Sequence, residues 1–467
     1  MYREQLEAYF QDKQDMLVDA VCRLVSIDSV EGEPAPGAPF GPGPAAALEE
    51  GLKLAQEWGL ITQNHEGYVG TADLCDKADA LHILGHLDVV APGEGWTVTQ
   101  PYQPKVVDGL IYGRGTDDDK GPVVASLLAM KAVKDLGVPL KSNCRLIMGT
   151  NEESGSGDIA WYFARNPFAP ATFSPDSGYP VINTEKGGLK PTFSRSWPVQ
   201  EALPRVKWLH GGFRINVLPG DAEAAVEGLT LHDVHPFARD ITARTGITFT
   251  CTSQDGCTVI HAKGEGSHAA WPEGGNNAVT GLIALLCALP LAEGPCKEAL
   301  NQLNTLLPHG DYHGRALGIA QSEPIAGDLT VAFTLLEVTE TGLTGRFDSR
   351  VPLCATKENC ENVARAAFEQ SGFTFEGEQE EAHHTPADSP FVQTLLKRYE
   401  EYTGQKGECL STGGGTYVHE IPGGVAFGCT MPGFDTHLHG ADERVKIADL
   451  MLSAKLFAHI ILDLCAE

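Results

Sequence analysis

The sequence predicts an α/β protein with an open sheet and a second domain in the middle of the chain. Apolar runs at 80–90 and 143–148 are typical of buried strands, and a strong helical pattern at 123–136 lies between them. In such sheets, ligands bind where the strands end. The 467 residues are too many for one core. We therefore expect two or more domains, with 184–383 as a second one because its composition changes to alternating short strands and helices.

Composition excludes several classes of protein. Acidic residues number 62 against 34 basic ones, and the formal net charge of −28 argues against nucleic acid or anionic membranes as partners. The 12 cysteines include no CxxC pair, which favours buried thiols in a reducing compartment. The first residues carry charges throughout and lack an apolar signal core. The longest apolar run, 282–292, is too short to span a bilayer. We expect a cytoplasmic protein.

Turn signals and apolar spacing define the other elements of the first domain. Helices are expected at 4–27, 44–59 and 444–466, a Gly- and Pro-rich loop at 31–44, and a hairpin at 103–111 that turns at Asp108-Gly109.

The middle of the chain alternates short strands with two helices. Strands are expected at 190–194, 206–216, 248–251, 257–264, 329–337 and 343–351, and helices at 222–228 and 277–289.

Three acidic stretches follow elements of the first domain. His86 and Asp88 lie where the 80–90 strand ends, and residues two apart on a strand face one way. A neutral imidazole oriented by a second group is a good zinc ligand, although a buried core histidine is the alternative. Asp117, Asp118 and Asp119 precede the helix at 123–136. One aspartate would cap the helix, but three in a row favour a bound cation over capping alone.

The third acidic stretch is Glu152-Glu153, after the 143–148 strand, and Asp176 lies in a later turn. Paired carboxylates let a metallohydrolase separate two tasks: one binds the ion, and the other takes a proton from water. An ordinary acidic loop is the alternative in so acidic a protein.

These motifs together resemble the dinuclear zinc exopeptidase family, which includes aminoacylases, desuccinylases, carnosinases and bacterial V-type dipeptidases. They read GHLDVV at 85–90, YGRG at 112–115, DDKG at 118–121, the Glu152-Glu153 pair, and THLHGADE at 436–443. The resemblance is closest to the V-type dipeptidases. It implies a zinc-exopeptidase catalytic domain formed by 1–183 and 384–467, a mixed sheet between helices, with an enlarged α+β lid inserted at 184–383.

The resemblance also implies residue roles in the first domain. The metal ligands would be His86, Asp118, Glu153, Asp176 and His439, with His437 as a rival to His439. Glu152 would be the general base and Asp88 a supporting acid. The peptide bond between Asp118 and Asp119 is expected to be cis.

In the lid, three segments resemble those that bind substrate in this family. Asn216 and His268 would polarise the scissile carbonyl, and Arg350 would grip the substrate carboxylate, for which a planar guanidinium is suited. The Gly-rich loop of Gly413, Gly414 and Gly415 would hold the same carboxylate through its backbone. Each residue also has a purely structural alternative: His268 as an interfacial histidine, Asn216 as a turn residue and Arg350 as a surface arginine. The loop lacks the lysine of a nucleotide-binding motif.

The resemblance implies hydrolysis of free dipeptides by a metal-bound water, with Glu152 as the base. Two divalent ions are expected, zinc with manganese or cobalt as alternatives, since the ligands are nitrogen and oxygen only. A lid of about 200 residues implies a monomer. The alternatives are an N-acyl-amino-acid amidase or desuccinylase of the same family and a non-catalytic metal- or peptide-binding protein. Retention of Glu152 argues against the second alternative.

Overall fold

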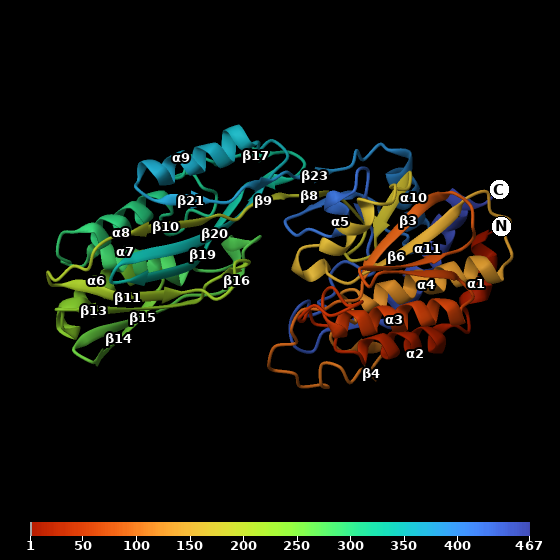
Figure 1. The fold of residues 1–467 in the computed structure, drawn as a ribbon, viewed down its shortest axis with the longest axis horizontal. Coiled ribbons are helices and arrows are strands. Elements are labelled where there is room, and N and C mark those ends of the chain that lie inside the picture. Colours follow the sequence, from red (N-terminus) through yellow and green to blue (C-terminus); the bar gives the residue numbers. More distant parts are fainter. Residues whose placement is uncertain (1) are drawn as a thin grey trace. The chain divides into compact units, whose positions relative to one another are not determined.

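The computed structural model describes residues 2–467, and the chain forms two compact units (Figure 1). The first unit comprises Met1–Thr184, His384–Ser411 and Gly415–Glu467, and the second comprises Glu185–His383 and Thr412–Gly414. The chain thus leaves the first unit after Thr184 to form the second and returns at His384, and three later residues, Thr412–Gly414, also belong to the second unit. No helix among residues 2–467 is long and apolar enough to cross a bilayer.

The first unit is built on a nine-stranded mixed sheet. Its strands are β1 (Ile61–His65), β2 (Val69–Asp73), β3 (Asp79–His86), β6 (Asn143–Gly149), β7 (Ala171–Ser174), β8 (Val181–Glu185), β23 (His383–His384), β24 (Cys409–Thr412) and β25 (Val425–Ala426). Their order is β1-β2-β6-β3-β7-β25-β8-β23, with β24 beside β8. β3 runs parallel to both β6 and β7, so these three strands end at the same edge.

Helices cover both faces of this sheet. The helices are α1 (Tyr2–Phe10), α2 (Gln14–Val25), α3 (Pro42–Glu57), α4 (Lys120–Asp135), α5 (Gly157–Phe163), α10 (Pro390–Thr403) and α11 (Ile447–Cys465). Along β3, Leu81 and Ile83 join the large core under α1 to α4, α10 and α11, whereas Leu84 faces α5 in a smaller core. This alternation explains why the strand is apolar throughout, because both of its faces are buried.

Several predicted elements of the first unit are confirmed with shifted ends. The region 4–27 forms two helices, because residues 11–13 interrupt α1 and α2. The hairpin is β4 (Lys105–Val107) and β5 (Leu110–Tyr112), with positive φ at both Asp108 and Gly109 as a tight two-residue turn requires. The last helix begins at Ile447, since 444–446 pair with β5 as strand β26 (Arg444–Lys446).

The second unit is a ten-stranded sheet with helices packed on it. Its strands are β9 (Gly187–Leu189), β10 (Thr192–Ser196), β11 (Arg205–Gly211), β13 (Asp221–Glu227), β14 (Thr248–Gln254), β15 (Cys257–Lys263), β19 (Thr330–Thr339), β20 (Gly342–Val351), β21 (Thr374–Glu376) and β22 (Gln379–Glu380). Its helices are α6 (Leu231–Thr245), α7 (Ala278–Ala288), α8 (Pro295–Leu306) and α9 (Asn362–Gln370). Short ribbons add β12 (Val217–Leu218) with β16 (Ser267–His268), and β17 (Ser322–Glu323) with β18 (Gly327–Asp328).

One predicted helix of the second unit is wrong. Residues 222–228 form most of β13, which pairs antiparallel with β11 and β15. Their alanines favour a helix in isolation, but Ala222, Ala224 and Val226 alternate with outward residues and fill the core. Three helices, α6, α8 and α9, were not predicted. The helix expected at 277–289 is confirmed as α7.

Candidate active site

The sheet of the first unit brings the predicted ligands to one edge. His86 is the last residue of β3, the Glu152-Glu153 turn follows β6, and Asp176 follows β7. Asp118 lies in the turn that leads into α4, and the predicted cis peptide after it is confirmed. Because β3 is parallel to β6 and β7, their carboxyl ends place side chains from segments 90 residues apart beside one another.

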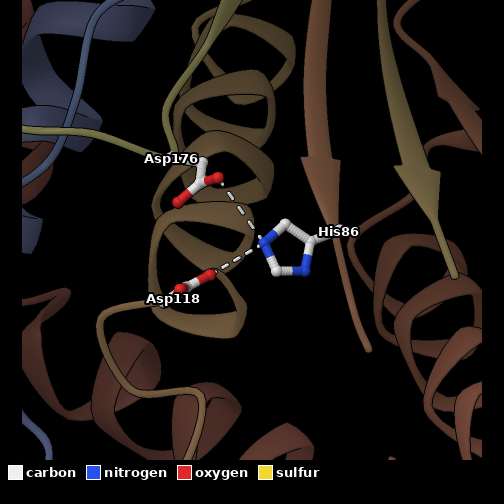
Figure 2. Close-up of side chains that lie close together, drawn as sticks. All are labelled: His86, Asp118 and Asp176. Carbon is white, nitrogen blue, oxygen red and sulfur yellow. Dashed lines mark ion pairs between the residues drawn. The ribbon is translucent and has the colours of Figure 1, made fainter. Parts of the chain in front are cut away.

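A first group of ligand atoms forms around His86. Its Nε2 atom lies 2.8 Å from Asp118 Oδ1 and 3.6 Å from Asp176 Oδ2. Figure 2 shows both carboxylates pointing toward this one ring nitrogen. The His86 ring is fully buried, so the three side chains meet in a site shielded from water.

A second group shares Asp118 with the first. His439 Nε2 lies 2.9 Å from Asp118 Oδ2 and 3.3 Å from Glu153 Oε2. In each group, the ligand atoms all lie within 4.8 Å of one another. Asp118 therefore offers one oxygen to each group, as a carboxylate that bridges two cations would. His437 belongs to neither group, because its ring faces the Ala441 carbonyl and the Asp435 carboxylate.

The donor atoms of these groups fit divalent cations. His86 Nε2, Asp118 Oδ1 and Glu153 Oε1 are buried and make no hydrogen bond, although buried polar atoms are almost always paired. His86 Nδ1 lies 3.0 Å from the Asp88 carbonyl oxygen. A proton on Nδ1 that donates to this carbonyl leaves the Nε2 lone pair directed at the two carboxylates. Lone pairs from nitrogen and oxygen converging on one point are what zinc or manganese binds.

The protonation equilibria of the site show that it stabilises positive charge. Burial raises the pKa of the Glu153 carboxyl to about 7, and the nearby Asp118 carboxylate adds to the rise. Burial acts to lower the pKa of His439, but hydrogen bonds to Asp118 and Glu153 outweigh it and raise the pKa to about 11. Burial also raises the pKa of the Glu152 carboxyl well above its usual value. Crowded carboxylates of this kind attract either protons or cations.

Asp88, the predicted supporting acid, contacts the site through both its backbone and its side chain. The strand ends at His86, and the backbone carbonyl of Asp88 faces the ring. The Asp88 carboxylate lies 3.5 Å from His86 Nδ1 and accepts hydrogen bonds from the Glu152 amide at 3.1 Å and the Glu153 amide at 3.0 Å. Asp88 thus fixes both the histidine, through its backbone, and the Glu152-Glu153 turn, through its side chain.

A second buried carboxylate holds the beginning of the same turn. Asp158 Oδ2 accepts from the Thr150 amide at 2.6 Å and the Asn151 amide at 3.0 Å. The Tyr417 hydroxyl donates to the same oxygen. A methyl group at Gly149 would collide with this hydroxyl, so the pair packs directly against the end of β6. Four successive amides, from 150 to 153, are therefore held by two buried aspartates.

The predicted substrate-binding residues lie in the second unit except Gly415, which belongs to the first. Three hydrogen bonds hold the Arg350 guanidinium. On β20, its Nε and Nη2 atoms donate to the two oxygens of Asp348 at 2.7 and 2.8 Å. Its Nη1 atom donates to the Gly413 carbonyl at 2.6 Å. Gly413 itself packs against Ala270, where an added methyl would lie 2.9 Å from the Ala270 Cβ. Hydrogen bonds thus tie the guanidinium to both Asp348 and the first part of the Gly-rich loop.

His268 lies at the end of β16, which pairs with β12 immediately after Asn216. The Asn216 carbonyl accepts from the Ala269 amide at 2.9 Å, so the two predicted residues are joined through the backbone. The Ala270 amide donates to His268 Nδ1 at 3.2 Å. Since Nδ1 is an acceptor here, the neutral ring carries its proton on Nε2. That tautomer is the one that can donate a hydrogen bond to a carbonyl.

Comparison with known proteins identifies the family. The model of peptidase family M20/M25/M40 matches residues 82–463. The chain belongs to this family. It is therefore a hydrolase of the peptidase class, and the resemblance inferred from its motifs is confirmed.

Two curated M20/M25/M40 relatives match almost end to end. "Putative dipeptidase YtjP" of Bacillus subtilis (strain 168) is 34% identical over 458 residues, covering 97% of each chain. The Beta-Ala-Xaa dipeptidase of Lactobacillus delbrueckii subsp. lactis is 32% identical over 462 residues, again covering 97% of each chain.

Solved structures confirm the predicted fold class, an α/β catalytic domain with an inserted α+β lid. Human carnosine dipeptidase 1 has a TM-score of 0.58 at 16% identity, covering 99% of each chain. The aminoacylhistidine dipeptidase from Vibrio alginolyticus has a TM-score of 0.59 at 13% identity, covering 97% of each chain.

Sequence reasoning missed the buried residues that support the M20 site. Asp158 and Tyr417 carry no local signal, because one lies in a short helix and the other 259 residues away. Asp348, two residues before Arg350, was missed as well. Its two-residue spacing on a strand placed both side chains on one face, which would have predicted the ion pair.

Proposed function

We propose that this chain is a metal-dependent dipeptidase that hydrolyses the peptide bond of free dipeptides. The observation that carries the proposal is the pair of ligand groups that share Asp118, together with a Glu152 carboxyl that interacts electrostatically with members of both groups. The names of the curated relatives support the dipeptide as substrate. All twelve cysteines are free thiols, which supports the cytoplasm as the compartment.

One divalent ion would be held by His86, Asp118 and Asp176, and a second by Asp118, Glu153 and His439. When bound, two such ions would act as Lewis acids toward the scissile carbonyl and toward water. The ligand set suits zinc, manganese or cobalt.

The chain's own residues carry the proton and orient the substrate. Glu152, which belongs to neither ligand group, takes a proton from the attacking water as the water oxygen bonds to the carbonyl carbon. It then delivers that proton to the amine nitrogen as the carbon–nitrogen bond breaks. His268 would donate from Nε2 to the carbonyl oxygen, with Asn216 beside it. Arg350 and the loop of Gly413, Gly414 and Gly415 would bind the substrate carboxylate.

Substrate length distinguishes this proposal from its alternatives. A tripeptide cleaved at its first bond carries its carboxylate about 3.5 Å farther from the scissile bond. Steady-state assays should compare a free dipeptide, the tripeptide extended from it and an N-acyl amino acid, with zinc or manganese supplied. We expect the highest kcat/KM for the dipeptide, at least tens of times that of the tripeptide. A preference for the N-acyl amino acid would favour the amidase alternative, and turnover of none of them would favour a binding protein.

Asp118→Ala should lose at least one of the two ions, because its carboxylate offers an oxygen to each ligand group. Elemental analysis of the purified protein after dialysis measures the stoichiometry. Asp388→Ala removes an exposed aspartate of the same unit and should keep both ions. Two ions per chain in the Asp118 variant would contradict its bridging role.

We also expect a monomer. The second unit contains a ten-stranded sheet with its own core, which supports the view that one chain supplies the whole lid. Sedimentation velocity at micromolar concentration should give one species of 49.9 kDa. A stable dimer would show that the enlarged lid does not replace a partner subunit.

A further inference from the structure

A buried ion pair outside the ligand groups links the two chain segments that carry Asp118 and His439. Arg114 and Glu443 are almost completely buried, and Arg114 Nη1 donates to Glu443 Oε2 at 2.5 Å. Arg114 lies four residues before Asp118, and Glu443 lies four residues after His439. A buried pair of this kind is not needed for stability in general, since apolar side chains can replace such pairs without loss.

Glu443 holds the turn that carries Asp118. Its second oxygen, Oε1, accepts hydrogen bonds from the Gly115 and Asp117 amides, both at 3.0 Å. The Asp118 amide lies 3.4 Å from the same oxygen. One carboxylate thus binds the backbone on the approach to Asp118, in the same way that Asp88 binds the Glu152-Glu153 turn.

Arg114 holds the loop that carries His439. Its Nη2 atom donates to the carbonyl oxygens of His439 and Gly440, each at 3.0 Å. This loop contains three non-glycine residues at positive φ, His437, His439 and Asp442, a conformation that persists only where surrounding contacts enforce it. The His439 side chain is 41% exposed, so packing does not fix its position. The hydrogen bonds from Arg114 act directly on the His439 and Gly440 carbonyls, whereas Asp442 binds the loop farther along, at Thr97 and Val98.

We propose that Arg114 and Glu443 form a positioning pair for the second ion, the one assigned to Asp118, Glu153 and His439; this rests on the proposed function. The first group takes its histidine from β3 and does not contain His439, so its ion depends less on the pair. The planar guanidinium of arginine can donate hydrogen bonds to one carboxylate and two carbonyls at the same time. The ammonium group of lysine cannot reproduce that geometry.

The test is a calorimetric titration of the metal-free full-length protein with Mn²⁺, and separately with Zn²⁺. We expect two sites in wild type. In Arg114→Lys, the first site should keep its affinity and the second should weaken at least about tenfold, as loss of a residue behind a metal ligand typically does. The matched control is Arg398→Lys, since Arg398 binds Asp463 through two hydrogen bonds away from the site. It should keep both sites.

Glu443→Gln is the second variant, because it keeps an oxygen for the amides of residues 115 and 117 while removing the charge opposite Arg114. It should also weaken the second site more than the first. Circular dichroism of each metal-free variant shows whether it is folded. Two sites of wild-type affinity in both variants, equal weakening of both sites, or failure of both variants to fold would overturn the inference. Failure of wild type to bind two ions would instead overturn the proposed function.

Discussion

Glu152→Gln is expected to lower kcat at least about 100-fold while both ions stay bound, since general acid–base catalysis contributes roughly 10²- to 10⁴-fold. Glutamine has nearly the same shape as glutamate but accepts no proton from water. Glu152 belongs to neither group of ligand atoms, and its backbone is fixed by the Asp88 carboxylate, so the substitution leaves the ligands in place. Initial rates with a free dipeptide, together with elemental analysis of the same preparation, measure both quantities.

The control for this variant is Glu49→Gln, which changes an exposed glutamate on α3 and should leave the rate unchanged. A Glu152→Gln protein that kept more than a tenth of the wild-type kcat would show that another group takes the proton. A variant that lost its ions would show that Glu152 is itself a ligand.

Arg350→Lys should abolish most of the preference for a free dipeptide over the corresponding dipeptide amide. In the proposed complex, the guanidinium binds the substrate carboxylate, and breaking such a buried pair costs about 2–5 kcal/mol. The expected loss in kcat/KM for the dipeptide is therefore tens-fold to several thousand-fold. The rate for the amide should change little, because an amide offers no charge for Arg350 to bind.

Lysine is preferred to alanine here because Asp348 is fully buried and keeps a cationic partner. Arg195→Lys is the matched control, since Arg195 lies on β10 of the same sheet and pairs with Glu298. Equal hydrolysis of the dipeptide and its amide by wild type would show that Arg350 does not recognise the carboxylate.

The ligand set could be predicted because its signals are local. His86, Asp118, Glu153 and Asp176 each follow a strand or precede a helix that apolar spacing reveals, and parallel strands must end at one edge. The choice of His439 over His437 came from the family pattern, and the structure places only His439 against Asp118. The contacts that each ligand side chain makes with its neighbours depend on interatomic distances, which the spacing of residues in the sequence does not reveal.

The parts that could not be predicted depend on contacts between distant segments. β13 is strand because two neighbours pair with it, although its alanines favour a helix. The Asp88 carboxylate binds amides 64 and 65 residues away, and Arg114 binds carbonyls 325 and 326 residues away. Such side-chain-to-backbone bonds leave no periodic pattern in the sequence.

In the proposed mechanism, dipeptide hydrolysis depends on two divalent ions at the Asp118 site. The most direct test removes all metal with a chelator, then adds Mn²⁺ or Zn²⁺ in fractions of an equivalent while following hydrolysis of a free dipeptide. We predict no turnover in the metal-free protein and full activity only after two equivalents have bound. Full activity in the metal-free protein would contradict this mechanism. So would hydrolysis that reaches its maximum rate while the protein binds no divalent ion.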